Sequence, residues 1–106
     1  MIRGDIYWID LNPTMGSEIN KLRPCVLIGA TPINAARHTV VVIPLSTSAK
    51  ERPPLTISVT CLQKKVVAIC DQIRAVDKSR LKNQIGSLPV KEMEALEDGL
   101  KQIFCL

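Results

Sequence analysis

The sequence contains no apolar run that approaches the roughly 20 residues needed to cross a bilayer as a helix, so we expect no membrane-spanning segment. The first predicted strand begins shortly after Met1, which leaves no room for a secretory signal peptide. We therefore expect the protein to remain in the cytoplasm, where it is made.

Histidine and paired cysteines are also scarce. His38 is the only histidine, which excludes a two-histidine mechanism, and no G-x-S-x-G motif is present to indicate Ser–His–Asp hydrolysis. No C-x-x-C pair and no histidine at zinc spacing accompany the four cysteines, Cys25, Cys61, Cys70 and Cys105. We interpret them as reduced thiols and expect no metal site. Without a P-loop or a dinucleotide fingerprint, we expect no cofactor either.

What remains is the composition of a small soluble protein. Hydrophobic residues make up 46% of the 106 residues and charged residues 23%, which predicts one domain over residues 1–106. The formal net charge is +4, an excess that favours an anionic partner without proving one. Aromatic residues make up only 3%, and Tyr7 and Trp8 lie together in the first predicted strand. We therefore expect this strand to anchor the core.

The pattern of short apolar runs predicts a mainly β protein with one terminal helix, an α+β fold. Pro89 precedes the best helical pattern, in which Met93, Leu96, Leu100 and residues 103–104 form one apolar stripe. Strands are predicted over residues 6–9, 25–28, 40–43 (ended by Pro44), 55–59 and 66–70. Such strands favour a small bent antiparallel sheet or partly open barrel. They carry more apolar surface than one small domain needs, which predicts a homodimer.

The loop after the first strand is long and polar and ends at Arg23-Pro24. Long loops in compact domains are usually functional or disordered. Sequence alone leaves two interpretations open: a mobile surface connection, or a flap over a binding surface with Arg23 at its root.

Polar residues stand at the ends of three predicted strands. Arg23 begins one strand, Ser46-Thr47 follows the next, and Asp71-Gln72 closes a third. Taken singly, each has an ordinary structural explanation, such as a solvated arginine, a turn or an acceptor for backbone N–H groups. Strand ends of a small barrel can lie close together, so the combination indicates a site.

Four segments in this order, RGDIYWIDLNPTMGSE, RPCVLIG, VVVIPLSTS and CDQIRAVDKSRL, resemble the MazF/PemK (Kid) family of toxin endoribonucleases. The resemblance implies an SH3-like, CcdB/PemK-type β-barrel with a C-terminal helix, assembled as a homodimer in the bacterial cytoplasm. It also implies metal-independent, sequence-selective cleavage of single-stranded RNA, and inhibition by a cognate antitoxin.

The same resemblance assigns residues. Arg23, Ser46 and Asp71 match catalytic positions, with Ser46 where many members have threonine and Asp71 either catalytic or in contact with RNA. The RNA-binding set that it implies is Ser17, Glu18, Thr47, Gln72 and Arg74. The chain departs from the family at Ile19 and Lys21, where members commonly have Gln and Gly, and at Ile69, which replaces the arginine of the Kid branch.

The chemistry of RNA agrees with these residue types. RNA supplies its own nucleophile, the 2′-hydroxyl, so the protein has to hold the phosphate in line and stabilise its growing charge. A guanidinium is a planar fork that meets phosphate oxygens two at a time. The competing hypothesis is a non-catalytic binding module on the same fold, like the gyrase inhibitor CcdB.

Overall fold

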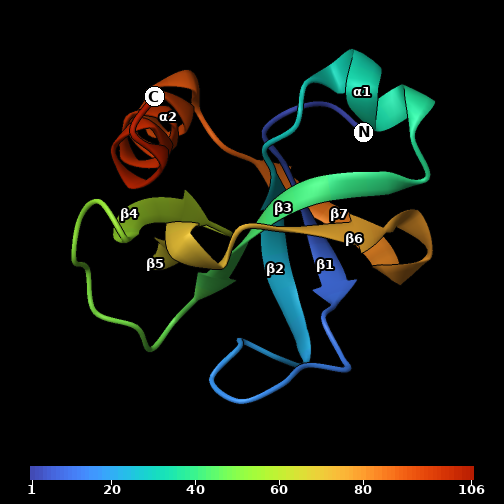
Figure 1. The fold of residues 1–106 in the computed structure, drawn as a ribbon, viewed down its shortest axis with the longest axis horizontal. Helices are drawn as coiled ribbons and strands as arrows, with labels where there is room; N and C mark the ends of the chain where they lie inside the picture. Colours follow the sequence, from blue (N-terminus) through green and yellow to red (C-terminus); the bar gives the residue numbers. More distant parts are fainter.

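The computed structural model describes residues 1–106, which form one curled antiparallel sheet with helices at its margins (Figure 1). In chain order the elements are β1 (Asp5–Asp10), β2 (Leu22–Leu27), α1 (Thr31–Ala36), β3 (Thr39–Ser46), β4 (Thr56–Cys61), β5 (Lys64–Ile69), η1 (Cys70–Gln72), β6 (Arg74–Asp77), η2 (Lys78–Arg80), β7 (Leu81–Ser87) and α2 (Val90–Phe104). Neither α-helix has the length and apolar character that a membrane-crossing helix requires. The predicted mainly β fold with a C-terminal helix is confirmed.

β3 is the strand around which the sheet curls. The strand order is β4-β5-β3-β2-β1-β7, and β6 also pairs with β3. Residues 39–42 of β3 pair with β6, whereas Leu45 and Ser46 pair with β5. This change of partner along one edge of β3 bends the sheet into a half-barrel. It also brings the beginning of β2, the end of β3 and the end of β5 toward one another.

The prediction that Pro44 ends a strand is wrong, because β3 continues through Pro44 to Ser46. Proline lacks a backbone N–H and is therefore disfavoured within a sheet. Pro44 lies between the part of β3 that pairs with β6 and the part that pairs with β5, where the ladder on that edge is interrupted. Its missing N–H therefore removes no bond from a continuous ladder.

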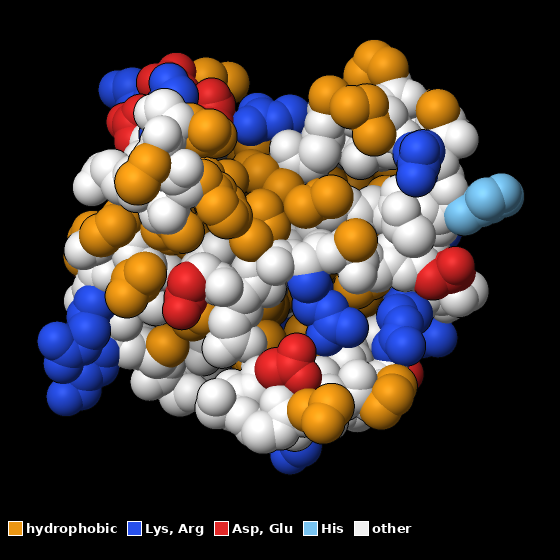
Figure 2. Space-filling model, viewed as in Figure 1, with side chains coloured by type: hydrophobic (Ala, Val, Ile, Leu, Met, Phe, Trp, Pro, Cys, Tyr) orange, Lys and Arg blue, Asp and Glu red, His pale blue; other side chains and the backbone are white.

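Two apolar clusters fill the two faces of the sheet. The larger one packs α2 against the sheet through residues such as Met93 and Leu96. The smaller one contains Ile9, Leu27 and Val42. The all-apolar strands are therefore mostly covered within one chain. Figure 2 shows a group of apolar side chains at the surface between α2 and α1, over β3, while others lie apart from it on the same face.

The first strand contributes to the core as predicted, but through its aliphatic rather than its aromatic residues. Tyr7 and Trp8 are both only half-buried, and Tyr7 packs at the margin of the smaller cluster. Aliphatic side chains such as Ile6 and Ile9 occupy the centre instead. Trp8 lies opposite Pro24 in the middle of the β1–β2 ladder, and its ring stays partly accessible.

α2 confirms the predicted terminal helix with one correction. Met93 and Leu96 are buried, but Phe104 is 51% exposed and does not complete the apolar stripe. The Glu92 carboxylate accepts hydrogen bonds from the Thr60 N–H and hydroxyl, both over 2.9 Å, and so fastens α2 to the edge strand β4. Gly99 lets α2 approach closely, since a Cβ there would lie 2.5 Å from Cδ1 of Ile57.

Candidate active site

The loop between β1 and β2, residues 11–21, is closed at its root by its own hydrogen bonds. The Leu11 N–H donates to the Lys21 carbonyl over 3.0 Å, which continues the β1–β2 ladder by one step. The Lys21 N–H donates in turn to the Asn12 side-chain oxygen over 3.3 Å. The two ends of the loop are therefore held together before any contact with the rest of the sheet.

Two arginines from later elements, Arg74 of β6 and Arg80 of η2, donate hydrogen bonds to the same root. Arg74 at the start of β6 donates from Nη1 to the Leu11 carbonyl over 3.3 Å. Arg80, which precedes β7, donates from Nη1 to the carbonyls of Asp10 and Asn12. A guanidinium has several N–H donors in one plane, which suits it to gathering such carbonyls. Arg80 was not among the predicted residues, because its partners are 68 and 70 positions away in the sequence.

The tip of the loop is fixed as well. Glu18 Oε1 accepts a hydrogen bond from the Met15 N–H over 2.6 Å, which closes a turn within the loop. Gln72 Oε1 accepts one from the Ile19 N–H, also over 2.6 Å, and the Ile19 side chain packs on the smaller apolar cluster. These contacts make the loop one wall of a hollow rather than a detached connection.

The hollow beside this wall, which we call the central cavity, has a volume of about 420 Å³. Its lining includes five of the eight predicted site residues: Ser17, Arg23, Ser46, Asp71 and Gln72. They come from the loop, β2, β3 and η1, the elements that the curled sheet brings together. Arg52 also lines it and was missed, because it lies in a proline-rich segment whose charges alone indicate nothing beyond a solvated loop.

Arg23 is half-buried and held by one of its nitrogens. Its Nε donates to the Asn20 carbonyl over 2.9 Å, and no hydrogen bond within the chain uses its two terminal nitrogens. The side chain is thus oriented at Nε while the N–H groups of Nη1 and Nη2 stay available. This arrangement leaves a guanidinium able to bind an anion in the central cavity.

Ser46 is 5% exposed and lies at the end of β3. Its Oγ accepts hydrogen bonds from the N–H groups of Ser48 and Ala49, both over 3.2 Å, and lies 3.4 Å from the Ser48 hydroxyl. The hydroxyl therefore has the structural role that such a residue has in a turn. Because its oxygen already accepts two N–H bonds, the proton is what it can offer, either to the Ser48 hydroxyl or, in its place, to a ligand. Continuing the β2–β3 register, in which Cys25 lies opposite Pro44, puts Arg23 opposite Ser46.

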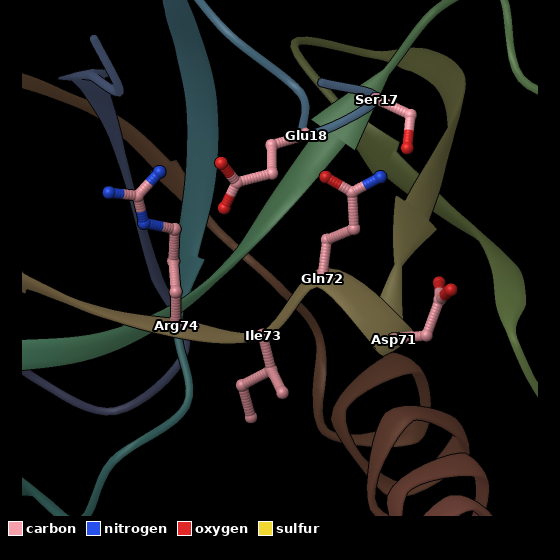
Figure 3. A pocket seen from close by; sticks show the side chains of 6 residues that line it. All are labelled: Ser17, Glu18, Asp71, Gln72, Ile73 and Arg74. Atoms are coloured by element: carbon pink, nitrogen blue, oxygen red, sulfur yellow. The ribbon is translucent and has the colours of Figure 1, made fainter. Parts of the chain in front are cut away.

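A second hollow, the loop cavity, adjoins the first through shared lining residues and has a volume of about 330 Å³. It is lined by Ser17, Glu18 and residues 71–74. Figure 3 shows the Glu18 carboxylate on the side of Gln72 that faces Arg74, whereas Asp71 lies on the other side. Asp71 is exposed, and its side chain makes no hydrogen bond within the chain. Glu18 and Arg74 therefore line the loop cavity only, whereas Arg23 and Ser46 line the central cavity.

Thr47, the last of the eight, lines a third hollow of about 240 Å³. We call it the tryptophan cavity; Trp8, Arg23 and Ser46 are among its other lining residues. The three cavities together therefore contain every predicted site residue.

The thiols near these cavities are held in the neutral form. Burial raises the pKa of Cys25 to about 12, although the nearby charges of Arg74 and Arg23 act in the opposite direction. Burial and the neighbouring Asp71 carboxylate raise the pKa of Cys70 to about 11. Since the thiolate is the nucleophilic form of cysteine, neither side chain is suited to nucleophilic attack near neutral pH. No three His, Cys, Asp or Glu side chains lie close enough to hold a metal ion together.

Residues 2–104 match the model of one protein family, described as the PemK-like, MazF-like toxin of type II toxin-antitoxin systems. The chain belongs to this family. Among named relatives, the chain is 33% identical to endoribonuclease MazF9 of Mycobacterium tuberculosis, over 95% of this chain and 93% of that one. It is also 33% identical to endoribonuclease MazF of Staphylococcus saprophyticus, over 94% and 88% of the two chains.

Solved structures of MazF proteins have the same fold. Crystalline MazF from Deinococcus radiodurans superposes with a TM-score of 0.89 at 20% identity, over 100% of this chain and 97% of that one. An endoribonuclease from a mycobacterial species, solved with its cognate antitoxin, gives a TM-score of 0.83 at 19% identity, over 100% and 96% of the two chains. The CcdB-like alternative is not favoured by these matches, because the relatives are named endoribonucleases.

The departures of this MazF-like chain from its family have structural explanations. Lys21 has φ +70°, a conformation that glycine adopts at no steric cost, so the loop keeps the backbone shape of a glycine there. Ile69 is 7% exposed and adds an apolar patch to the wall of the central cavity. Asp71 therefore has no arginine two positions before it, and the acid–base pair of the Kid branch is absent.

Proposed function

We propose that the chain is an endoribonuclease that cleaves single-stranded RNA without a metal ion, the toxin of a toxin-antitoxin pair acting in the bacterial cytoplasm. The observation that carries this proposal is the Arg23 guanidinium, held at Nε with its terminal nitrogens free, in one cavity with Ser46 and Asp71. The endoribonuclease names of its relatives support the same conclusion.

In the proposed reaction the RNA 2′-oxygen forms a bond to the adjacent phosphorus while the bond from phosphorus to the 5′-oxygen breaks. The 2′-hydroxyl gives up its proton, and the departing 5′-oxygen gains one. The products are a 2′,3′-cyclic phosphate and a 5′-hydroxyl. Arg23 binds the phosphate oxygens on which negative charge grows, where fixed donors have most effect. Arginine stays protonated in proteins, which makes it a charge stabiliser rather than a proton donor.

Ser46 and Asp71 take the other two roles. The Ser46 hydroxyl donates its proton to a phosphate oxygen, since its own oxygen already accepts two N–H bonds. Asp71 is exposed in both the central and the loop cavity. It serves either as the base that takes the 2′-proton or as an acceptor for a base edge of the RNA. Ser17, Glu18, Thr47, Gln72 and Arg74 contact the nucleotides on either side, and the net charge of +4 favours binding of the polyanion.

Purified protein is expected to cleave a single-stranded messenger transcript in excess EDTA at the same rate as without it. The reason is that the nucleophile is the 2′-hydroxyl of the RNA, and that Arg23 stabilises the negative charge growing on the phosphate oxygens. The measurement is cleavage of a labelled transcript, with end analysis of the products for 2′,3′-cyclic phosphate and 5′-hydroxyl groups. Loss of cleavage on chelation that returns with a divalent ion would contradict the metal-free mechanism.

We also propose that the active form is a homodimer. The sequence predicted a dimer from surplus apolar strand surface. The structure weakens that reason, because the two clusters cover most of this surface within one chain. The support that remains is the apolar region between α2 and α1 (Figure 2). α1 and β3 also each carry an exposed apolar side chain, Ile33 and Val41. Sedimentation at micromolar concentration is expected to give twice the mass of 11.7 kDa, and a monomer mass would refute the proposal.

The partner that inhibits the toxin is proposed to be an acidic, partly disordered antitoxin segment that folds onto the RNA-binding surface of this basic protein. Mycobacterial and Deinococcus relatives have been solved with an antitoxin or as MazE-MazF, which supports such a partner. A cognate antitoxin that bound the toxin and left RNA cleavage unaffected would contradict it.

A further inference from the structure

Trp8 has a position that neither the core nor the proposed chemistry explains. It is the only tryptophan, and it is half-buried in a chain whose cores are aliphatic. A large aromatic side chain that stays partly exposed gives up stabilisation from burial. Its partial exposure in the middle of β1, opposite Pro24, therefore calls for a reason outside folding.

The tryptophan cavity around it combines an apolar floor with a polar rim. The buried side chains of Leu45 and Val66 line it together with Leu22, Pro24 and Trp8. The rim is formed by Arg23, Ser46 and the exposed Thr47. The side chain of Thr47 makes no hydrogen bond within the chain. A flat apolar surface edged by unused donors has the character of a nucleobase site, since a base has a stacking face and a polar edge.

The cavity is also continuous with the proposed reaction centre. Arg23 and Ser46 line both the tryptophan cavity and the central cavity. A phosphate bound by Arg23 would therefore have one of its two flanking nucleotides beside Trp8. This continuity distinguishes the cavity from an isolated apolar patch.

We propose that Trp8 is the stacking platform for the nucleobase next to the cleaved phosphate, with Thr47 hydrogen-bonding the edge of that base. The inference rests on the proposed ribonuclease function and adds a base subsite to it. Trp8 then contributes to RNA binding and to the choice of cleavage site, whereas Arg23 contributes to the rate of the chemical step.

The test uses the wild type and the variants Trp8→Ala and Trp8→Phe, with cut sites mapped on one messenger transcript. A short oligonucleotide spanning the strongest site then serves as substrate. Trp8→Ala is expected to raise KM about 5- to 150-fold, the range of base–aromatic stacking, and to alter the base preference beside the cut. Trp8→Phe should restore most of both. Leu62→Ala, which removes an exposed apolar side chain at the β4–β5 turn, is the matched control and should leave cleavage unchanged.

An abasic nucleotide separates stacking from a structural role. Placed beside the cut on the side that Trp8 serves, it should raise KM for the wild type but add little to the loss in Trp8→Ala. The same oligonucleotide with a 2′-O-methyl group at the cut cannot be cleaved, and it should quench the fluorescence of the single tryptophan on binding. The abasic version should not quench it.

Each contrary result has its own meaning. In one contrary result the wild type cleaves the transcript, but an abasic nucleotide at each position near the cut raises KM as much for Trp8→Ala as for the wild type. The base subsite is then refuted and the ribonuclease function stands. In another, tryptophan fluorescence changes as the protein is diluted, in parallel with the mass measured by sedimentation, and stays constant when the oligonucleotide is added. That result would assign Trp8 to an interface between copies. A wild type that cleaves no RNA would overturn both proposals.

Discussion

Replacing Arg23 by alanine is expected to lower the rate of RNA cleavage by about a hundred- to a thousand-fold, the usual cost of losing one preorganised donor to transition-state charge. The structure holds the guanidinium at Nε through the Asn20 carbonyl and leaves its terminal nitrogens unused. The donor geometry therefore exists before the substrate binds. The measurement is single-turnover cleavage of a labelled oligonucleotide at saturating enzyme, which reports the chemical step.

Arg23→Lys is expected to recover little of this loss. Lysine keeps the charge but presents it as a point on a flexible chain, so it cannot meet two phosphate oxygens in one plane. It also cannot reproduce the Nε contact with the Asn20 carbonyl that orients the side chain. A lysine variant with near wild-type rate would show that charge alone matters at this position.

Arg37→Ala is the matched control for the loss of positive charge. Arg37 is an exposed arginine at the end of α1, and its side chain makes no hydrogen bond within the chain. Both alanine variants lower the formal net charge of +4 by the same amount, so they weaken the general attraction for RNA equally. Wild-type cleavage by Arg23→Ala, with an unchanged thermal midpoint, would place the active site elsewhere.

The part of this site that sequence could predict is the part determined by strand ends. Arg23, Ser46 and Asp71 stand next to apolar runs whose boundaries are visible in the sequence, and the structure places all three on one cavity. To predict that these three residues meet at one site, it was enough to expect a small curled sheet. The same boundaries led to the error at Pro44, because sequence does not show where a strand changes partner.

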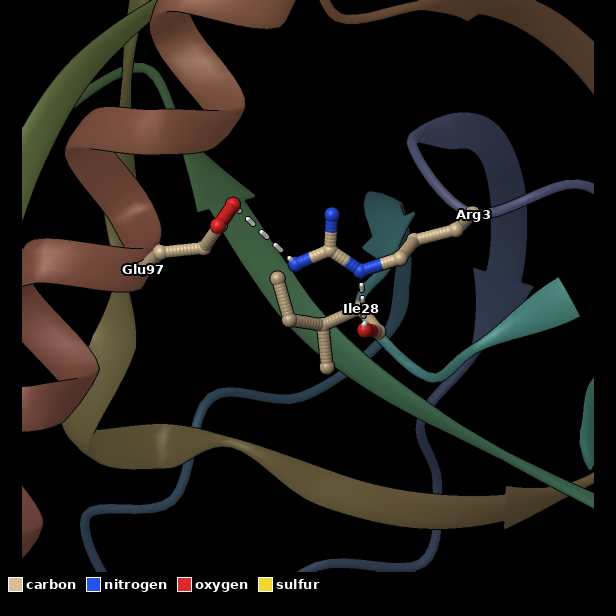
Figure 4. Close-up of polar contacts among 3 residues, drawn as sticks. All are labelled: Arg3, Ile28 and Glu97. Atoms are coloured by element: carbon tan, nitrogen blue, oxygen red, sulfur yellow. Dashed lines mark hydrogen bonds and ion pairs between the residues drawn. The ribbon is translucent and has the colours of Figure 1, made fainter. Parts of the chain in front are cut away.

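Long-range polar contacts were beyond such reasoning. Arg3 donates from Nε to the Ile28 carbonyl over 3.0 Å and lies 3.6 Å from the Glu97 carboxylate on α2 (Figure 4). Nothing near Arg3 in the sequence indicates either partner, and the same holds for Arg80 at the loop root. β7 was missed for a related reason. Its central residues 82–84 are polar and exposed, so it has no apolar alternation to mark it as a strand.

Ser46→Ala is expected to lower kcat by about a hundred-fold, whereas Ser46→Thr keeps most of the activity. Alanine removes the proton that we assign to a phosphate oxygen. Threonine retains a hydroxyl on the same carbon, and its β-branched side chain is well suited to a strand such as β3. The measurement is kcat and KM for the two variants on the same oligonucleotide.

The structural role of Ser46 makes a second readout necessary. Its Oγ accepts the N–H groups of Ser48 and Ala49, so alanine also removes two turn contacts, which costs about 1 kcal/mol of folding free energy per hydrogen bond. A fall in thermal midpoint alone would therefore not identify a catalytic residue. The decisive quantity is kcat measured at a temperature well below that midpoint, where all of the protein is folded.

Ser79→Ala provides the control for removing a serine hydroxyl as such. Ser79 is exposed in η2, lines none of the three cavities, and contacts only the neighbouring Asp77, to which its backbone N–H donates over 2.8 Å. We expect its kcat to equal that of the wild type. If Ser46→Ala also retained wild-type kcat while losing stability, Ser46 would be only the residue that closes the turn after β3. The phosphate would then depend on Arg23 without a hydroxyl donor.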